Sequence, residues 1–296
     1  MTERHGFLSS VVPVVTVLFV IGVVWLVATV VLNTPWQKDV YKRADRTDVG
    51  LVEFIGATMT QERPVLPSPQ QVAVELYNTT VKKKITSKRS LLFHSKITLS
   101  SALLGFVMGT LLGIVLSVGI TYNQALNKSL MPWIITSQTI PILAIAPMVI
   151  VVLNSIGVQG LVPKAFISMY LSFFPIAVGM VKGLNSPDIS HLDLMHTYSA
   201  SKWQSFWKLR LPSSLPYLFT SMKIAVAISI VGAIVAELPT GAVAGLGARL
   251  LAGSYYGQTV QIWSALVMAS ILAASLVGLV GLAGHWVTRR MGLQHA

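Results

Sequence analysis

The chain has 296 residues, of which 53% are hydrophobic and 11% are charged, and its mean hydropathy is +0.69. An ordinary soluble domain carries about 25% charged residues, so this composition excludes a soluble globular protein and indicates a membrane protein. The net charge of +12 does not indicate a nucleic-acid-binding protein, because the basic residues punctuate apolar segments instead of gathering in one soluble region, and the absence of cysteine excludes disulfides and thiolate metal sites.

The first apolar segment covers residues 8–32 and carries no charge. A membrane span needs about 20 predominantly apolar residues, whereas the apolar region of a cleaved signal peptide has about 7 to 15. The segment also lacks a small-x-small cleavage site before Asn33. We therefore expect residues 1–32 to form a retained N-terminal transmembrane helix.

The segment 33–90 is the one long polar stretch, and it holds six of the ten acidic residues. It is too polar for the hydrocarbon, so we expect it to lie outside the membrane, on the periplasmic side. Pro67-Ser68-Pro69 ends one part of it, and residues 70–81 are predicted to form a short surface helix that opens after a proline. This helix either contacts lipid or a partner, or belongs to a solvated linker.

The uncharged segment 97–120 carries small side chains every four residues, at Gly105, Gly109, Gly113 and Ser117. Such a ridge lets the backbone of a neighbouring helix approach closely. We read it first as a packing surface, and secondarily as a contact that slides during transport.

Residues 129–163 are also uncharged, but they are too many for one span and contain Pro132, Pro141 and Pro147. Interior prolines bend or break helices. We expect one kinked helix over residues 130–154, a turn at 157–160 and a new helix from about residue 162. The kinked helix is a candidate pathway wall, whose polar side chains either line the pathway or make ordinary interhelical hydrogen bonds. These side chains are Gln138, Thr139 and Asn154.

Three further apolar segments, 165–181, 213–236 and 250–288, bring the expected number of transmembrane helices to six. Lys223 interrupts the second of them, where it either belongs to the pathway or snorkels towards the headgroups. Glu237 follows the same segment at its outer end. It could gate the pathway, contact a docking protein or pair with Arg249.

A polar segment, 185–212, separates two of these spans and contains the most informative motif. It reads Asp193-Leu-Met-His-Thr-Tyr-Ser199-Ala-Ser-Lys-Trp203-Gln-Ser-Phe-Trp-Lys-Leu-Arg-Leu211-Pro212. The segment resembles the cytoplasmic coupling loop of the permeases of binding-protein-dependent ABC importers. In that family a Glu-Ala-Ala, a Gly four positions after the second Ala and a closing apolar-x-Leu-Pro recur at this spacing. Here Asp193 stands at the Glu, Leu194 and Met195 at the alanines, and Ser199 at the Gly, so the spacing is kept while the first residues depart.

The resemblance extends over residues 64–290 and includes further short motifs typical of the branch that imports nitrate, sulfonates, taurine and pyrimidine-like or riboflavin-like precursors. These are Leu66-Pro67-Ser68-Pro69, Pro141 with Pro147, Phe173-Phe174-Pro175, Lys223, Glu237 and Gly245-Leu-Gly247. It implies an all-α, polytopic, MetI-like permease in the bacterial cytoplasmic (inner) membrane, with a core domain over residues 91–290. Within this resemblance, the stretch from Glu237 to Trp263 implies a small heteroaromatic solute in preference to nitrate or sulfonate.

The resemblance also implies the residues that contact a motor subunit and the partners of the chain. The expected ATPase-coupling residues are Asp193, Ser199, Ala200, Ser201, Lys202, Trp203, Leu211 and Pro212. The chain has no Gly-x-x-x-x-Gly-Lys-Ser/Thr motif, so we expect no enzymatic activity and no cofactor in it, with ATP and Mg bound by partner ABC ATPases. The other expected partners are a second permease copy or a paralogue, a periplasmic or lipid-anchored solute-binding protein, and lipid.

The charges conflict with the orientation that a cytoplasmic coupling loop requires. With six spans, that loop places segment 33–90 outside, although basic residues near a membrane end normally mark the cytoplasmic side. The basic residues concerned are Lys82, Lys83, Lys84, Lys88 and Arg89. We follow the coupling loop, because the rule weakens for a loop of this length.

Two other classes of protein were considered. A secondary transporter driven by protons or sodium would need carboxylates at the middle of the membrane. Outside segment 33–90 the acids are Glu3, Asp188, Asp193 and Glu237, none of them in the middle of a span. A membrane scaffold or membrane-embedded enzyme finds no support either, because no nucleophile–base pair or metal constellation is recognisable; His191 and His196, five residues apart, do not share a helix face.

Overall fold

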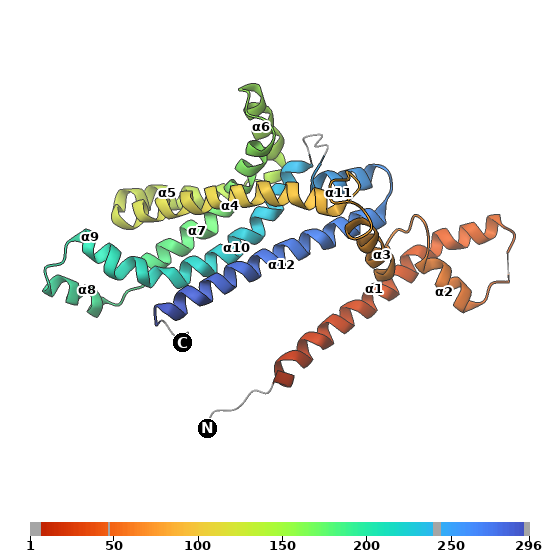
Figure 1. Cartoon of the computed structure of the whole chain (residues 1–296), viewed down its shortest axis with the longest axis horizontal. Helices are drawn as coiled ribbons and strands as arrows, with labels where there is room; N and C mark the ends of the chain where they lie inside the picture. Colours follow the sequence, from red (N-terminus) through yellow and green to blue (C-terminus); the bar gives the residue numbers. More distant parts are fainter. Residues whose placement is uncertain (1–6, 47, 239–243, 293–296) are drawn as a thin grey trace. The chain divides into compact units, whose positions relative to one another are not determined.

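A computed structural model describes residues 7–46, 48–238 and 244–292, and within these ranges the secondary structure is helical (Figure 1). The elements are α1 (Phe7–Arg43), α2 (Leu51–Met59), α3 (Pro69–Thr80), α4 (Leu91–Tyr122), α5 (Gln124–Ser137), α6 (Ile142–Ser155), α7 (Leu161–Leu184), α8 (Ile189–Thr197), α9 (Lys202–Ser205), a π-helical turn (Phe206–Arg210), α10 (Leu211–Glu237), α11 (Leu246–Tyr255) and α12 (Thr259–Arg290). The prediction of an all-α fold is confirmed.

Five helical segments among the described residues are long and apolar enough to cross a membrane, and a bent pair of shorter helices brings the number to six. The five are Val11–Arg43, Leu91–Tyr122, Leu161–Leu184, Lys202–Glu237 and Thr259–Arg290, and the pair is Gln124–Ser137 with Ile142–Ser155. This agrees with the expected six spans. The chain divides into two compact units, residues 1–91 with 249–267 and residues 92–248 with 268–296, which are described separately below.

In the first unit the polar segment folds against α1. The helix runs past residue 32, where the N-terminal span was expected to end, and continues to Arg43. Buried Asn33 explains the continuity: its amide donates to the carbonyls of Thr58 (3.0 Å) and Leu66 (2.9 Å), and its Oδ1 accepts from the backbone N–H of Val65 (2.8 Å) and of Leu66 (3.2 Å). One side chain thus satisfies four backbone groups, which attaches a loop to the helix.

The short surface helix predicted at residues 70–81 is confirmed as α3. Ser68 caps its N-terminus by accepting from the backbone N–H of Gln71, and the Gln71 side chain accepts from the N–H of Ser68, so the pair forms a capping box. Pro69 occupies the first turn, where its missing N–H costs nothing.

In the second unit, the ridge of small residues on α4 packs against α7, as the sequence predicted. A Cβ placed on Gly105 would lie 2.3 Å from the Cβ of Ser168, and one on Gly109 would lie 2.2 Å from the Oγ of Ser172. A Cβ on Gly113 would lie 2.7 Å from Ile176. At Gly105 and Gly113 these close contacts include Cβ atoms and backbone oxygens, so the two positions accept no side chain, whereas at Gly109 the closest atom is the rotatable Ser172 hydroxyl and the backbone lies at 3.1 Å.

Helix α10 packs closely on α7 through small residues on both helices. Gly179 faces Ser221, Gly183 faces Ser214, and Gly232 lies against the backbone at Ser168. This contact and the α4 contact place α7 between α4 and α10, and Figure 1 shows the three helices side by side.

The segment predicted as one kinked helix is instead two helices, α5 and α6, that meet at an angle of 101°. The physical reason is Pro141, which starts α6 as its N-cap and has no N–H to donate to the carbonyl of Ser137 four residues earlier. The hydroxyl of Tyr170, on α7, donates to that carbonyl instead. A tertiary hydrogen bond thus replaces the missing helical one and stabilises the break.

Candidate coupling segment and pathway residues

The coupling segment begins with α8 and turns at the position where the family has glycine. Ser199 has a φ of 51°, in the left-handed region that glycine adopts most readily. The chain then starts α9, where Ser201 accepts from the backbone N–H of Gln204 and the Gln204 side chain accepts from the N–H of Ser201. The two short helices are therefore separated by a sharp turn and a capping box, both fixed by local sequence.

Helix α9 continues without a gap into α10. The π-helical turn Phe206–Arg210 joins them, and the N–H of Leu211 donates to the carbonyl of Phe206, five residues earlier. Pro212 lies in the first turn of α10, where a missing N–H does not end the helix. The candidate span therefore extends from Lys202 to Glu237, and α9 belongs to the same continuous helical segment as α10.

Arg210 attaches the base of this helix to its neighbours. Its Nη1 donates to the carbonyl of Leu184 at 2.8 Å and to Oδ1 of Asn185 at 3.2 Å, both at the C-terminal end of α7. Its guanidinium also lies 5.9 Å from the ring centroid of Tyr122, at the end of α4. The sequence analysis did not single out Arg210. The available signal was its position directly before the closing Leu211-Pro212 pair.

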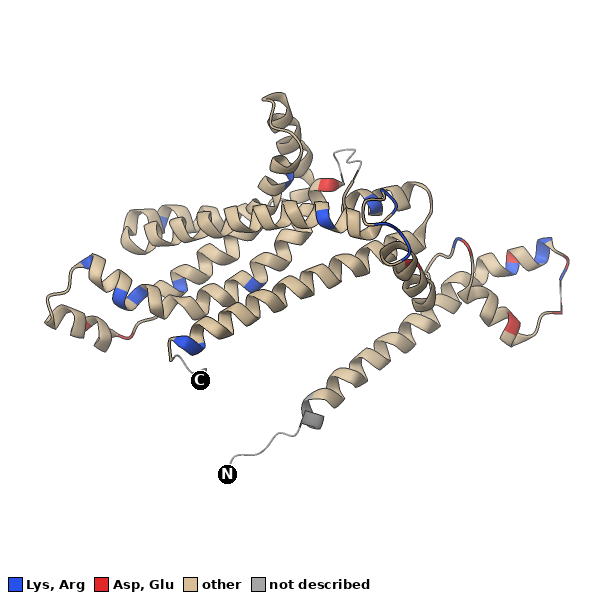
Figure 2. Cartoon of the chain, viewed as in Figure 1, with Lys and Arg blue, Asp and Glu red and all other residues tan. Residues whose placement is uncertain are grey.

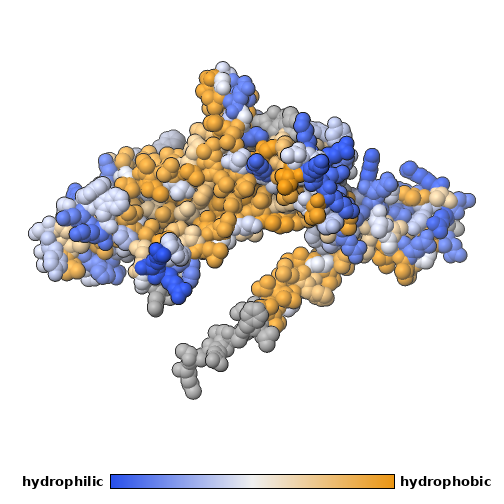
Figure 3. All heavy atoms as spheres, in the orientation of Figure 1, coloured by the Kyte–Doolittle hydropathy of each residue, from blue (hydrophilic) through white to orange (hydrophobic). Residues whose placement is uncertain are grey.

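The surface of the segment is polar and also exposes large apolar side chains. Its outer residues include Trp203, which is 69% exposed, and Tyr198, which is 77% exposed. Figure 3 shows hydrophilic residues over α8 and α9 and hydrophobic ones over the long helices of the same unit. Exposed rings at a polar end of a membrane protein are typical either of a surface that another protein covers or of a helix that lies at the level of the lipid headgroups.

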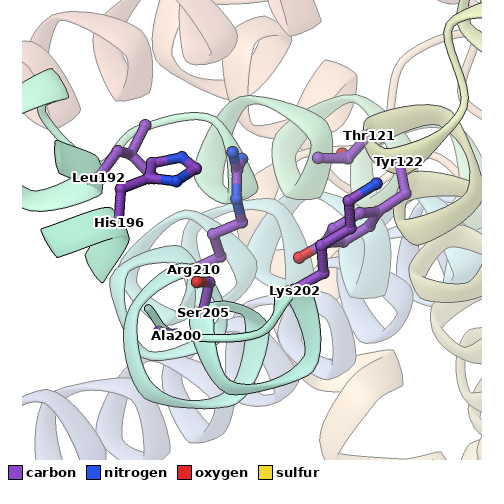
Figure 4. A pocket seen from close by; sticks show the side chains of 8 residues that line it. All are labelled: Thr121, Tyr122, Leu192, His196, Ala200, Lys202, Ser205 and Arg210. Atoms are coloured by element: carbon purple, nitrogen blue, oxygen red, sulfur yellow. The ribbon is translucent and has the colours of Figure 1, made fainter. Parts of the chain in front are cut away.

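A cavity of about 260 Å³ opens between this segment and the end of α4 (Figure 4). It is lined by Thr121, Tyr122, Leu192, His196, Ala200, Lys202, Ser205 and Arg210. Of the predicted coupling residues, Ala200 and Lys202 line the cavity, while exposed Asp193 and half-buried Leu211 are not among its lining residues.

The candidate pathway residues are distributed over three elements. Gln138 and Thr139 lie together at the break between α5 and α6, whereas exposed Asn154 lies at the opposite end of α6. Lys223 lies on α10 and is exposed, with its Cε 3.4 Å from the position of a Cβ on Gly281 of α12. The structure therefore brings together Gln138 and Thr139 at irregular backbone.

Glu237 ends α10 in a buried polar network. The side chain is fully buried, and its carboxyl oxygens accept from the hydroxyl of Thr98 (3.0 and 2.9 Å) and from the N–H of Gly247 (2.9 Å). Thr98 accepts in turn from the N–H of Leu246 at 2.8 Å. A Cβ on Gly245, whose φ is 129°, would lie 2.2 Å from the Glu237 carboxyl carbon, so only glycine fits there. In this conformation Glu237 stabilises the backbone at the start of α11. Because its side chain is buried, any effect of Glu237 on the docking of a solute-binding protein would be indirect, through the position of that backbone.

Up to six candidate spans among the described residues, with the polar helical segment 185–212 between two of them, define a polytopic helical membrane protein. Residues 103–293 match the family described as binding-protein-dependent transport system inner membrane component, and the chain belongs to that family. It is therefore a permease subunit of an ABC importer in the bacterial inner membrane, a transport component and not an ATPase.

Individual relatives agree with this assignment. The chain is 33% identical over 232 residues to the formylaminopyrimidine transport permease protein ThiX of Halalkalibacterium halodurans, covering 77% of this chain and 85% of the relative. It is 28% identical over 225 residues to the riboflavin transport system permease protein RibX of Chloroflexus aurantiacus, covering 76% and 80%.

The fold is also that of a solved transporter. A chain of the MetNI methionine ABC transporter in an inward-facing conformation superposes with a TM-score of 0.58 at 20% identity, covering 69% of this chain and 97% of that one. The predicted family and MetI-like fold are thus confirmed. The comparisons give no support to an ion-coupled secondary transporter.

Proposed function

We propose that this permease passes a small heteroaromatic solute, of the pyrimidine- or vitamin-precursor class, delivered by a solute-binding protein. The observation that carries the solute class is the 33% identity to a formylaminopyrimidine permease over most of both chains. Relatives that import aliphatic sulfonates and nitrate are less similar, at 23% and 26% identity, and they define the competing solute class.

The energy for transport comes from partner ATPases that grip segment 185–212. Three features support this role: the left-handed Ser199 at the glycine position of the motif, the exposed ring of Trp203, and the unbroken helix from Lys202 to Glu237. The remaining contact residues are Asp193, Ala200, Ser201, Leu211 and Pro212.

Alternating access requires a pathway, and the break between α5 and α6 is its best-supported element. Non-helical backbone at membrane depth is tolerated where it faces protein or a water-filled cavity. Gln138 and Thr139 present polar side chains at this break, and a second permease copy or a paralogue closes the pathway opposite them. Asn154 and Lys223 are assigned to the same pathway on the basis of their polarity within apolar helices.

The proposed topology places segment 33–90 outside and segment 185–212 inside. Its test uses the absence of native cysteine, by labelling Thr86→Cys and Ser201→Cys variants in intact cells with an impermeant maleimide. Labelling of the variant at Thr86 and protection of the variant at Ser201 are expected, and the reverse pattern would overturn the topology.

The solute is tested by uptake into proteoliposomes that contain the permease, its ATPase and the neighbouring solute-binding protein. We expect ATP-dependent uptake of labelled formylaminopyrimidine and a raised melting temperature of the binding protein in its presence. Uptake of nitrate or an aliphatic sulfonate in its place would refute the solute class but leave the importer assignment intact. Failure to co-purify an ATPase would refute the proposed motor.

A further inference from the structure

The basic loop that conflicts with the expected orientation lines a cavity in the first unit. The cavity has a volume of about 640 Å³ and lies among the end of α3, the loop that follows it, the start of α11 and the start of α12. Its lining residues are Glu75, Asn78, Thr79, Lys82, Lys83, Arg89, Arg249, Gln258 and Gln261, all within the same compact unit. The loop after α3 is visible as a blue stretch in Figure 2.

The charges around this cavity are unbalanced. Four of the lining residues are cationic and one, Glu75, is acidic, which leaves a net charge of 4 − 1 = +3. Arg249 is only half exposed, and burial, with the nearby charge of Arg89, lowers its pKa while Glu75 acts in the opposite direction. The side chains of Lys82, Lys83 and Arg89 are exposed, so Arg249 is the one lining cation whose burial calls for a counter-anion, and Glu75 is the one acidic residue among the lining residues.

The cavity also offers hydrogen-bonding groups besides the charges. Asn78 and Gln258 contribute amides to the wall, whereas the hydroxyl of Thr79 already donates to the carbonyls of Glu75 (2.6 Å) and Leu76 (3.3 Å) within α3. The Oε1 atom of Gln261 is buried and makes no hydrogen bond to the described residues. Because this atom exposes no surface, it does not face a ligand in the cavity, and the amide N–H groups of Asn78 and Gln258 are the neutral donors available to an anion.

The residues that line the cavity lie next to the ends of two candidate spans in the sequence, where the membrane surface is expected. The basic loop leads directly into α4. Gln258 lies directly before the first residue of α12, and Gln261 lies in its first turn. Both α4 and α12 are candidate spans. Exposed tyrosines accompany the cavity, with Tyr255 and Tyr256 at 79% and 71% exposure just before Gln258. Tyrosine and tryptophan favour the level of the lipid headgroups.

From these observations we infer that the cavity is a binding site for a phosphate group, in which the cations of the loop and Arg249 hold the phosphate oxygens. A concave site of this volume suits a headgroup or a small anion better than the convex surface of a protein. The phosphate comes either from a lipid headgroup or from the free ion. The inference does not depend on the proposed solute, and it explains why three of the five basic residues, Lys82, Lys83 and Arg89, stand where the charge rule for orientation disfavours them.

The experiment measures ligand binding to the full chain purified in a neutral detergent. The probes are short-chain phosphatidylglycerol, short-chain phosphatidylcholine and inorganic phosphate, each followed by microscale thermophoresis. The test variants are Arg89→Gln and the double variant Arg89→Gln, Arg249→Gln. The control is Lys84→Gln, which removes the same charge from the same loop at a residue that does not line the cavity.

We expect the double variant to lose at least tenfold in affinity for phosphatidylglycerol, Arg89→Gln to lose severalfold, and Lys84→Gln to stay within twofold of the parent. A loss confined to phosphatidylglycerol assigns the site to lipid, and an equal loss with inorganic phosphate assigns it to the free ion. Equal losses in Lys84→Gln and Arg89→Gln, or unchanged binding in both test variants, would overturn the inference. Arg89 is exposed, so its variant keeps the test decisive if the double variant does not fold.

A reduced affinity for the solute-binding protein with unchanged phosphate and lipid binding would also overturn the inference. That result would make the cavity a contact for acidic protein side chains.

Discussion

Replacing Arg210 by Ala tests whether the coupling segment acts as a lever attached to the other helices. The change removes two hydrogen bonds, of 2.8 and 3.2 Å, from the guanidinium to the end of α7, and the contact with the Tyr122 ring at 5.9 Å. Hydrogen bonds from a charged donor contribute about 1.5–3 kcal/mol each, and an exposed cation–π contact about 0.5–1 kcal/mol. Because the site is partly open to water, we take about 2 kcal/mol for the sum.

A loss of about 2 kcal/mol corresponds to a roughly 30-fold shift in the equilibrium between an attached and a detached helix base. Detachment leaves the proposed ATPase contact surface on α8 and α9 intact, so ATP hydrolysis should continue while fewer hydrolysis events move solute. We therefore expect the ratio of solute uptake to ATP hydrolysis in proteoliposomes to fall by about tenfold or more.

Two further variants make this test specific. Arg210→Lys keeps the charge but not the planar fork, so its uptake ratio should lie between those of the parent and the alanine variant. Lys208→Ala removes an exposed charge from the same π-helical turn and should leave the ratio unchanged. An unchanged ratio in Arg210→Ala, or an equal fall in Lys208→Ala, would refute the reasoning.

Three other predictions follow from the packing and the turns. Gly105→Ala inserts a Cβ 2.3 Å from the Cβ of Ser168 and 2.5 Å from the carbonyl oxygen of Ala165 and should cost about 1–3 kcal/mol, seen as a lowered melting temperature in detergent, whereas Gly278→Ala meets nothing within 4 Å and should not lower it. Tyr170→Phe removes the donor to the freed carbonyl at the α5–α6 break and should cost about 0.6–1.7 kcal/mol of unfolding free energy; no loss would show that water replaces the hydroxyl. Ser199→Gly should retain uptake, while Ser199→Val should lose about 1–2 kcal/mol in stability because its φ is 51°; equal behaviour of the two variants would contradict a left-handed turn in solution.

Local signals in the sequence were sufficient for several elements. The apolar runs predicted the six spans, the Pro67-Ser68-Pro69 motif predicted α3, and the four-residue spacing of Gly105, Gly109 and Gly113 predicted a close helix contact. Each of these features depends on residues within a few helical turns. For the spans, the bilayer adds a further constraint, because only apolar helices of sufficient length can cross it.

Features that depend on distant residues were not predictable in the same way. Prolines indicated a bend in segment 130–154, but whether the helix bends or separates depends on Tyr170, which supplies the missing donor from another helix. The contacts of Arg210 and the burial of Glu237 are likewise decided by partners 10 to 139 residues away. Asn33 gave no signal, because an asparagine at the end of an apolar run is also typical of a simple boundary.

The continuity of α1 has a consequence for how this permease tolerates changes in length. Its 37 residues extend about 55 Å at 1.5 Å per residue, well beyond a hydrocarbon core of about 30 Å. Trp25 and Asn33 lie on this one helix and both donate hydrogen bonds to the segment 58–67. Trp25 donates to the carbonyl of Pro67 at 3.0 Å, and Asn33 donates to the carbonyl of Leu66 at 2.9 Å. Inserting one residue between them would rotate one anchor by about 100° relative to the other. Between these two positions the amino acids of the helix can vary, but their number cannot, because both side chains must keep facing the same segment.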